Sequence, residues 1–323
     1  MTDVARKTAI KVLAALPLKA MVPWLLFAMV LYAIVMVLGG ANGTDSDTAI
    51  LDVALASVGA PPVVQAFVYI SIGAMAKETM TDYSIATLRT LGAWKGDIYI
   101  LTDNPSCFSS SIKTYDVKPV VVPRSMSKNI MEIKALKARV YEFLPIEVTS
   151  VMYLDVDIVV QKPVGHFLVN VGNSLKKLGG LFDLGAFPDA QGHYFGFCSG
   201  CEKWHTGVLF LRRYDGQSCL KEWGKLITSG EFDTDQESLD AAESRRMCEH
   251  MLTLAPSYLL FAKDYVAMAL TSGHTFVHIT AAGRLETQGY FYKNIVVPSL
   301  RGDSGVLDRE VDKDKECNSG KHK

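Results

Sequence analysis

Between residues 66 and 160, short apolar runs alternate with stretches whose apolar residues recur at helical spacing, and this alternation restricts the fold more than any other feature. Runs rich in β-branched and aromatic residues predict strands at 66–71, 97–101, 118–122 and 151–160, and the stretches between them predict helices at 82–91 and 130–144. Because the strands are almost wholly apolar, both faces of their sheet must be covered. This predicts an α/β domain with a mainly parallel central sheet, whose ligands bind at the carboxyl ends of the strands.

An uncharged segment precedes this alternating region. Residues 20–43 contain no charged residue, and 21–38 are nearly all aliphatic or aromatic, close to the roughly 20 residues that cross a hydrocarbon core. Four Lys or Arg residues lie before it, whereas the next charged residues are Asp45 and Asp47, so the amino terminus should be cytosolic. We expect a type II membrane protein with one transmembrane helix, placed in the Golgi membrane with the endoplasmic reticulum as the alternative.

Two other interpretations of this segment stay open. Gly39 and Ala41 offer small residues for a signal peptidase, but the apolar run is longer than the usual h-region of about 7 to 15 residues. A buried core helix would also be apolar, yet nothing in the segment is polar enough to face solvent. The length therefore favours the signal anchor.

Composition divides the chain further. We expect a cytosolic tail at 1–19, the anchor at 20–40, a Gly-, Ser- and Asp-rich stem at 41–64 and one folded domain at 65–300. Residues 301–323 are dense in charge and poor in large apolar groups, which predicts a flexible tail.

Charge and missing motifs exclude several functions. With 33 basic and 34 acidic residues the net charge is -1, so the chain offers no general field for nucleic acid. It contains no phosphate loop of the GxxxxGK[ST] type, no dinucleotide GxGxxG fingerprint and no GxSxG nucleophile elbow. Six cysteines can form disulfides in a lumenal domain, but the sequence does not determine their pairing.

Two carboxylates interrupt the apolar run at 151–160. Strand periodicity directs Asp155 and Asp157 to the same side, where they repel each other unless a cation neutralises them. Mg²⁺ and Mn²⁺ prefer such oxygen ligands and often share their coordination with substrate phosphates. A pair of solvated carboxylates at a strand end is the alternative.

The order of several motifs resembles glycosyltransferase family 8, the retaining nucleotide-sugar transferases of the GT-A fold. The resemblance spans about residues 66 to 285. Its pieces, in the order of the family, are the basic pattern at 137–139, the acidic strand at 151–160, and the motifs at 186–189, 206–209, 235–236 and 278–284.

The resemblance implies a role for each matching residue. Asp155, Asp157 and His278 would be the metal ligands. Arg139 and Asp189 would bind the donor, and Arg284, where the family has Lys, would hold its diphosphate. For Lys134 and Lys137 we favour a solvated helix face. His205 stands where the family has Asn, so sugar recognition is expected to differ.

Asp235 and Gln236 have two explanations. Thr234 and Glu237 fit a capping box, in which an acid at the first helical position is already explained by the helix dipole. The resemblance instead implies that Asp235 binds donor hydroxyls and that Gln236 lies near the reacting carbon. We favour the functional role because a helix start is a rigid mount.

The expected function is a metal-dependent retaining transferase that uses Mn²⁺ or Mg²⁺ and a nucleotide-sugar, expected to be a UDP-sugar, with a glycan or glycoconjugate as acceptor. Front-face attack and a covalent intermediate both stay open. A haloacid-dehalogenase-type phosphatase also has an apolar strand followed by DxD, although no downstream acidic pair supports it. A catalytically silent lumenal binding protein of the same fold is the other alternative.

Overall fold

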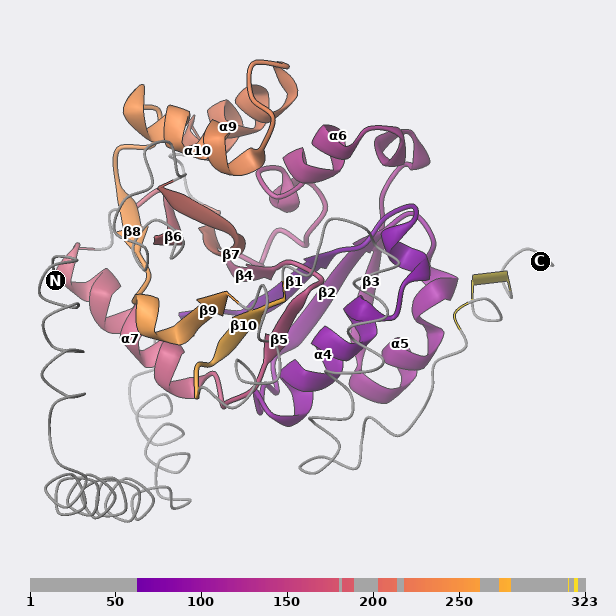
Figure 1. Cartoon of the computed structure of the whole chain (residues 1–323). Helices are drawn as coiled ribbons and strands as arrows, with labels where there is room; N and C mark the ends of the chain where they lie inside the picture. Colours follow the sequence, from indigo (N-terminus) through magenta and orange to yellow (C-terminus); the bar gives the residue numbers. More distant parts are fainter. Residues whose placement is uncertain are drawn as a thin grey trace, which may run out of the picture. The chain divides into compact units, whose positions relative to one another are not determined.

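The computed structural model describes residues 63–179, 182–188, 203–213, 218–261, 273–279, 313 and 317–318 (Figure 1). Within these ranges no helix has the length and apolar character needed to cross a membrane. The segment 20–40, where the anchor is expected, and the stem up to residue 62 lie outside them.

A seven-stranded sheet forms the centre of the domain, with the order β3-β2-β1-β4-β7-β6-β8. Its strands are β1 (Ala66–Ile70), β2 (Asp97–Thr102), β3 (Val117–Val121), β4 (Ser150–Leu154), β6 (Leu184–Pro188), β7 (Trp204–Arg212) and β8 (Met251–Thr253). Four pairings are parallel, and only those of β7 with β4 and with β6 are antiparallel. The mixed α/β fold with a mostly parallel sheet agrees with the prediction.

Helices cover both faces of this sheet, as the apolar strands require. Successive residues of β1 alternate between two cores: Ala66, Val68 and Ile70 belong to one, and Phe67 and Tyr69 to the other. The first core includes α6 (Ile130–Ala135), α9 (Ser218–Thr228) and α10 (Asp235–Ser244); the second includes α4 (Met80–Thr90), α5 (Ser109–Tyr115) and α7 (Gly165–Lys177). Figure 1 shows the two groups of helices on opposite sides of the sheet.

The expected continuous strand at 151–160 is wrong in one respect. The chain leaves the central sheet after Leu154, turns at 155–157, and enters a second sheet as β5 (Ile158–Val160). This three-stranded sheet has the order β5-β10-β9, with β9 at Leu259–Phe261 and β10 at Phe276–His278. The turn is closed by a hydrogen bond of 3.1 Å from the Ile158 N–H to the Asp155 carbonyl. The two acids therefore lie in the link between two sheets.

The expected helix at 130–144 also breaks. α6 begins at an Asn129 side chain that accepts from the Met131 N–H, and it ends at Ala135. From there the backbone makes bonds of the i to i+3 type, including Lys137 N–H to Lys134 carbonyl and Arg139 N–H to Leu136 carbonyl. Tighter turns change the angular spacing of side chains, so the α-helical spacing used for this stretch did not hold.

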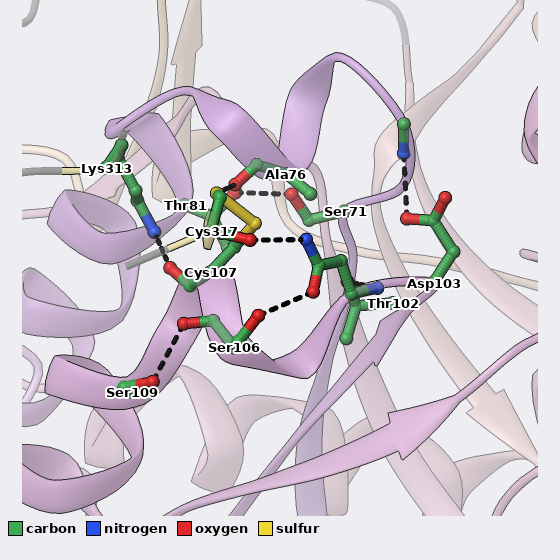
Figure 2. Close-up of a disulfide and its surroundings, with 12 residues drawn as sticks. Ser71, Ala76, Thr81, Thr102, Asp103, Ser106, Cys107, Ser109, Lys313 and Cys317 are labelled. Carbon is green, nitrogen blue, oxygen red and sulfur yellow. Dashed lines mark hydrogen bonds between the residues drawn. A yellow bond between two sulfur atoms is a disulfide. The ribbon is translucent and has the colours of Figure 1, made fainter. Parts of the chain in front are cut away.

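The carboxyl-terminal segment has fixed contacts that its composition did not predict. Cys317 forms a disulfide with Cys107, and Figure 2 shows this bond beside Ala76 and Lys313. The buried Lys313 ammonium pairs with Asp82 at 2.5 Å and donates to the Cys107 carbonyl. A second disulfide joins Cys219 to Cys248 and so ties α9 to the end of the α10 region. Of the tail expected at 301–323, the structure describes only residues 313, 317 and 318, so the flexibility of this segment stays a prediction.

Candidate active site

The acidic turn lies at the carboxyl end of β4. The Asp155 N–H donates to the Gly207 carbonyl of β7 at 2.7 Å, which holds the start of the turn against the antiparallel neighbour. The Tyr153 hydroxyl donates to the Asp155 carboxylate. Two strands of the central sheet therefore fix the first carboxylate before any ligand binds.

Pairing in the second sheet brings in a histidine. β10 runs antiparallel to β5 with His278 opposite Ile158, and the Ile279 N–H donates to the Asp157 carbonyl at 3.0 Å. The His278 Nε2 lies 3.1 Å from the Asp157 Oδ2. One ligand atom from each of Asp155, Asp157 and His278 lies within 4.8 Å of the others, so the three residues could hold a metal ion. The structure thus brings the three predicted ligands together.

Burial and neighbouring charges have opposite effects on the pKa values of these three residues. Burial alone would raise the pKa of Asp157, but the charge and hydrogen bond of His278, with a backbone hydrogen bond and Lys137, together lower it. Burial alone would lower the pKa of His278, and the Asp157 carboxylate reverses this and raises it. Burial raises the pKa of Asp155, with the Asp157 carboxylate adding to the effect and Lys137 opposing it. A cation with both carboxylates as ligands would relieve their mutual repulsion.

Lys137 is the residue that the sequence interpretation placed incorrectly. It is not on a solvated face: the residue is 6% exposed, and its ammonium lies among the carboxylates. Its Nζ is 3.1 Å from Asp155 Oδ1, 2.8 Å from Asp235 Oδ2 and 3.2 Å from the Thr206 carbonyl. It also lies 5.1 Å from the centre of the Tyr153 ring. One buried cation therefore connects the acidic turn to the start of α10.

The start of α10 has the predicted capping box, and Asp235 makes contacts of its own beside it. Thr234 and Glu237 form a complete capping box, with the Glu237 N–H donating to Thr234 Oγ1 at 3.0 Å and the Thr234 N–H donating to Glu237 Oε2 at 3.2 Å. Asp235 is not needed for the cap. Its buried carboxylate instead accepts from Thr206 Oγ1 at 2.6 Å and pairs with Lys134 at 3.1 Å as well as with Lys137. The Lys134 side chain keeps 28% of its surface exposed, so it reaches Asp235 from a position that is still partly solvated.

The two lysines keep Asp235 ionised. Burial alone would raise its pKa, but the charges of Lys137 and Lys134 and the hydrogen bonds to it lower the pKa of Asp235 well below its usual range. Burial alone would lower the pKa of Lys137, and the Asp155 and Asp235 carboxylates raise it instead. At neutral pH the site therefore contains a fixed anion and a fixed cation side by side.

His205 occupies the space beside Gly207. The residue is 1% exposed, and its Nε2 lies 2.9 Å from the Nδ1 of His278. A Cβ at position 207 would lie 2.5 Å from the His205 Cε1 and 2.9 Å from the Asp155 Oδ2, so only glycine leaves room for both side chains. Burial lowers the pKa of His205 well below its usual range, and the imidazole is neutral.

The predicted residues fall into three groups. Asp155, Asp157, Asp235 and Gln236 line one cavity of about 300 Å³, together with Lys134 and Lys137, and His278 lies behind Asp157. Arg139 lines a different cavity, and its guanidinium binds Glu142 with distances of 2.9 and 2.6 Å. The structure therefore does not bring Arg139 to the acidic turn. Asp189 and Arg284 lie outside the described residues.

The fold and the site together describe the class of protein to which this chain corresponds. It is an α/β protein in which two carboxylates, an imidazole and a carboxylate-bound lysine meet at the carboxyl ends of parallel strands, where such folds bind their ligands. No family model matches the chain, and no curated protein does.

Solved structures of glycosyltransferases are similar to this chain. The galactosyltransferase LgtC, in complex with donor and acceptor sugar analogs, has 12% identity and a TM-score of 0.48, over 78% of this chain and 99% of its own. Mouse xyloside xylosyltransferase 1 has 11% identity and a TM-score of 0.46, over 68% and 99%. The glycosyltransferase GlyE of Streptococcus pneumoniae has 16% identity and a TM-score of 0.46, over 72% and 61%. At such identities the likeness concerns the fold and not the activity.

Proposed function

We propose that this chain is a metal-dependent retaining glycosyltransferase that moves a sugar from a nucleotide diphosphate, UDP being the expected carrier, to a glycan, protein or lipid acceptor. The observation that carries the proposal is the meeting of Asp155, Asp157 and His278 with the ion pair of Lys137 and Asp235 at one cavity. The order of family-like motifs along the chain supports it independently.

The three candidate metal ligands fit a divalent cation. Two carboxylates and one neutral imidazole suit Mn²⁺, while Mg²⁺ favours sites made of oxygen alone. Asp155, Asp157 and His278 would hold the ion. When bound, it supplies positive charge for the departing diphosphate. Arg284 would add a second cation to that group by resemblance.

The other half of the site would bind the sugar. A carboxylate offers about four lone-pair positions, and Asp235 uses three of them for Lys134, Lys137 and Thr206. The remaining position can accept a donor hydroxyl. Gln236, the next residue of α10, lines the same cavity and would lie near the reacting carbon. Asp189 is proposed as a further ligand of sugar hydroxyls.

A lumenal location in the Golgi, or in the endoplasmic reticulum, is part of the proposal. Disulfides persist in oxidising compartments, and the pairs Cys107–Cys317 and Cys219–Cys248 support such a compartment. The apolar segment at 20–40 would anchor the chain with its amino terminus in the cytosol.

The first test is a panel of UDP-sugars incubated with the protein and Mn²⁺. Slow release of UDP that chelator abolishes is the expected result. Phosphate release from monoesters would favour the phosphatase instead, and no turnover of either kind would favour a binding protein.

Matched variants make this test specific to the site. Asp157→Asn should abolish UDP release because it removes one of two anionic ligands. Asp97→Asn changes an exposed acid that pairs with Lys118 on the surface, and it should leave the rate unchanged. Full activity of Asp157→Asn would overturn the proposed metal site.

A further inference from the structure

The position of His205 gives it a role that the family resemblance does not assign. We infer that His205 is a positioning residue for the metal ligand His278: it accepts a hydrogen bond from the His278 Nδ1 and so directs the Nε2 lone pair toward the cation. The inference rests on the proposed function, because it concerns the metal site of the proposed transferase.

Geometry supports this assignment. The two nitrogens of the His278 ring have different neighbours. Its Nε2 lies 3.1 Å from the Asp157 carboxylate, and its Nδ1 lies 2.9 Å from the His205 Nε2. The two ring centres lie 4.8 Å apart, and both residues are buried. Nε2 is therefore the nitrogen that lies among the carboxylates, and Nδ1 is the one that His205 controls.

Proton placement follows from the chemistry of imidazole. A neutral ring has one N–H donor and one acceptor nitrogen. If Nε2 is to give its lone pair to a metal, the proton must be on Nδ1, and that proton needs an acceptor in a buried site. The His205 Nε2 lies at hydrogen-bond distance and would be that acceptor. Outer partners of this kind orient the ligand and increase its basicity.

The chain holds the His205 ring from several sides. β7 begins next to it at Trp204, whose N–H donates to Asp240 of α10 at 3.1 Å. Gly207 leaves the space that the imidazole fills, since a methyl group there would overlap the ring. The backbone beside His205 is thus held by the sheet and by α10, and the ring fits the space above Gly207, which favours one orientation of its imidazole.

This arrangement predicts an effect on metal choice. Imidazole contributes more to binding Mn²⁺ than Mg²⁺, which takes oxygen ligands by preference. A change in the orientation of His278 should therefore weaken the binding of Mn²⁺ more than the binding of Mg²⁺. Mg²⁺ would still be bound by the two carboxylates of Asp155 and Asp157.

The experiment measures metal binding on the whole protein without any nucleotide-sugar. Mn²⁺ affinity is measured by electron paramagnetic resonance, and Mg²⁺ affinity by competition. His205→Leu should weaken Mn²⁺ binding by about 10- to 100-fold, the usual effect of losing an outer partner, and Mg²⁺ binding much less. His205→Gln, whose amide oxygen can accept, should restore most of the Mn²⁺ affinity. His250→Leu, at an exposed site, is the control and should bind both ions normally.

Several results would overturn the inference. Wild-type Mn²⁺ affinity in His205→Leu would do so, and so would equal loss in the Leu and Gln variants, which would indicate a packing role. If His205→Leu does not fold, ¹⁵N NMR of the Zn²⁺-loaded wild type decides: the inference requires a proton on Nδ1 of His278 and none on Nε2 of His205, and a proton on the His205 Nε2 would overturn it. Metal binding that persists in Asp157→Asn would instead refute the proposed metal site.

Discussion

Replacing Lys137 by Met removes the charge at the centre of the site while keeping a side chain of similar length. Asp235 then loses its 2.8 Å partner and Asp155 its 3.1 Å partner. Removing one member of a buried ion pair typically costs 3–5 kcal/mol, because the remaining charge is left uncompensated. Asp235 keeps Lys134 and Thr206, and Asp155 is partly exposed. We therefore expect Lys137→Met to lower the free energy of unfolding by about 2–4 kcal/mol at neutral pH.

The pH dependence of this loss has a definite sign. The pKa of Asp235 is lowered in the folded protein, so the pair's contribution is complete above the unfolded pKa of about 4 and is lost as pH falls below it. The pKa of Lys137 is raised, so its contribution is complete below about 10.5 and is lost only in more alkaline solution. The difference in the free energy of unfolding between wild type and Lys137→Met should be constant between about pH 4 and pH 10.5, and it should become smaller outside this range.

Urea unfolding of both proteins at several pH values measures the difference. Lys134→Met is the matched control: its side chain is 28% exposed, so the loss should be no more than about 1 kcal/mol. A loss in Lys137→Met no larger than that in Lys134→Met, or one independent of pH down to about pH 3, would refute the reasoning.

Three further predictions concern the same site. Thr234→Ala should lower the free energy of unfolding by about 1 kcal/mol through the lost N-cap, measured by urea unfolding, and leave metal affinity unchanged. Gly207→Ala should weaken Mn²⁺ binding, measured by calorimetry, because its Cβ would overlap the His205 ring and crowd Asp155. The pKa of His278 is raised, so Mn²⁺ affinity should be full above that pKa and fall as pH decreases through it, measured by calorimetry from alkaline solution down to the usual imidazole pKa of about 6.5.

Local patterns were sufficient to predict the strands of the first half of the domain. The predicted runs at 66–71 and 97–101 correspond to β1 and β2, because a strand buried on both faces must be apolar throughout. The same rule failed at 151–160, where the apolar residues on either side of the acidic turn belong to different sheets. Hydrophobicity reports that a residue is buried and not which layer buries it.

Residues that act through distant contacts were the hardest to predict. Lys137 appears in the sequence as one of several lysines on a polar helix face, and its burial depends on Asp235, which lies 98 residues away. His205 depends in the same way on His278, 73 residues away. The acids of the turn could be found because each is conspicuous in its own apolar surroundings. A lysine or histidine in a mixed sequence gives no such signal.

The disulfide between Cys107 and Cys317 also determines how the chain can be shortened. It closes a covalent ring over a sequence separation of 210 that contains every described strand from β3 to β10. In the chain-entropy account, closing a ring of this size restricts the unfolded chain by about 5 kcal/mol. Removing the last few residues, which from their composition appear dispensable, would open this ring and leave Cys107 as a lone thiol in the core. The covalent ring of the domain therefore closes only when Cys317 is present to pair with Cys107.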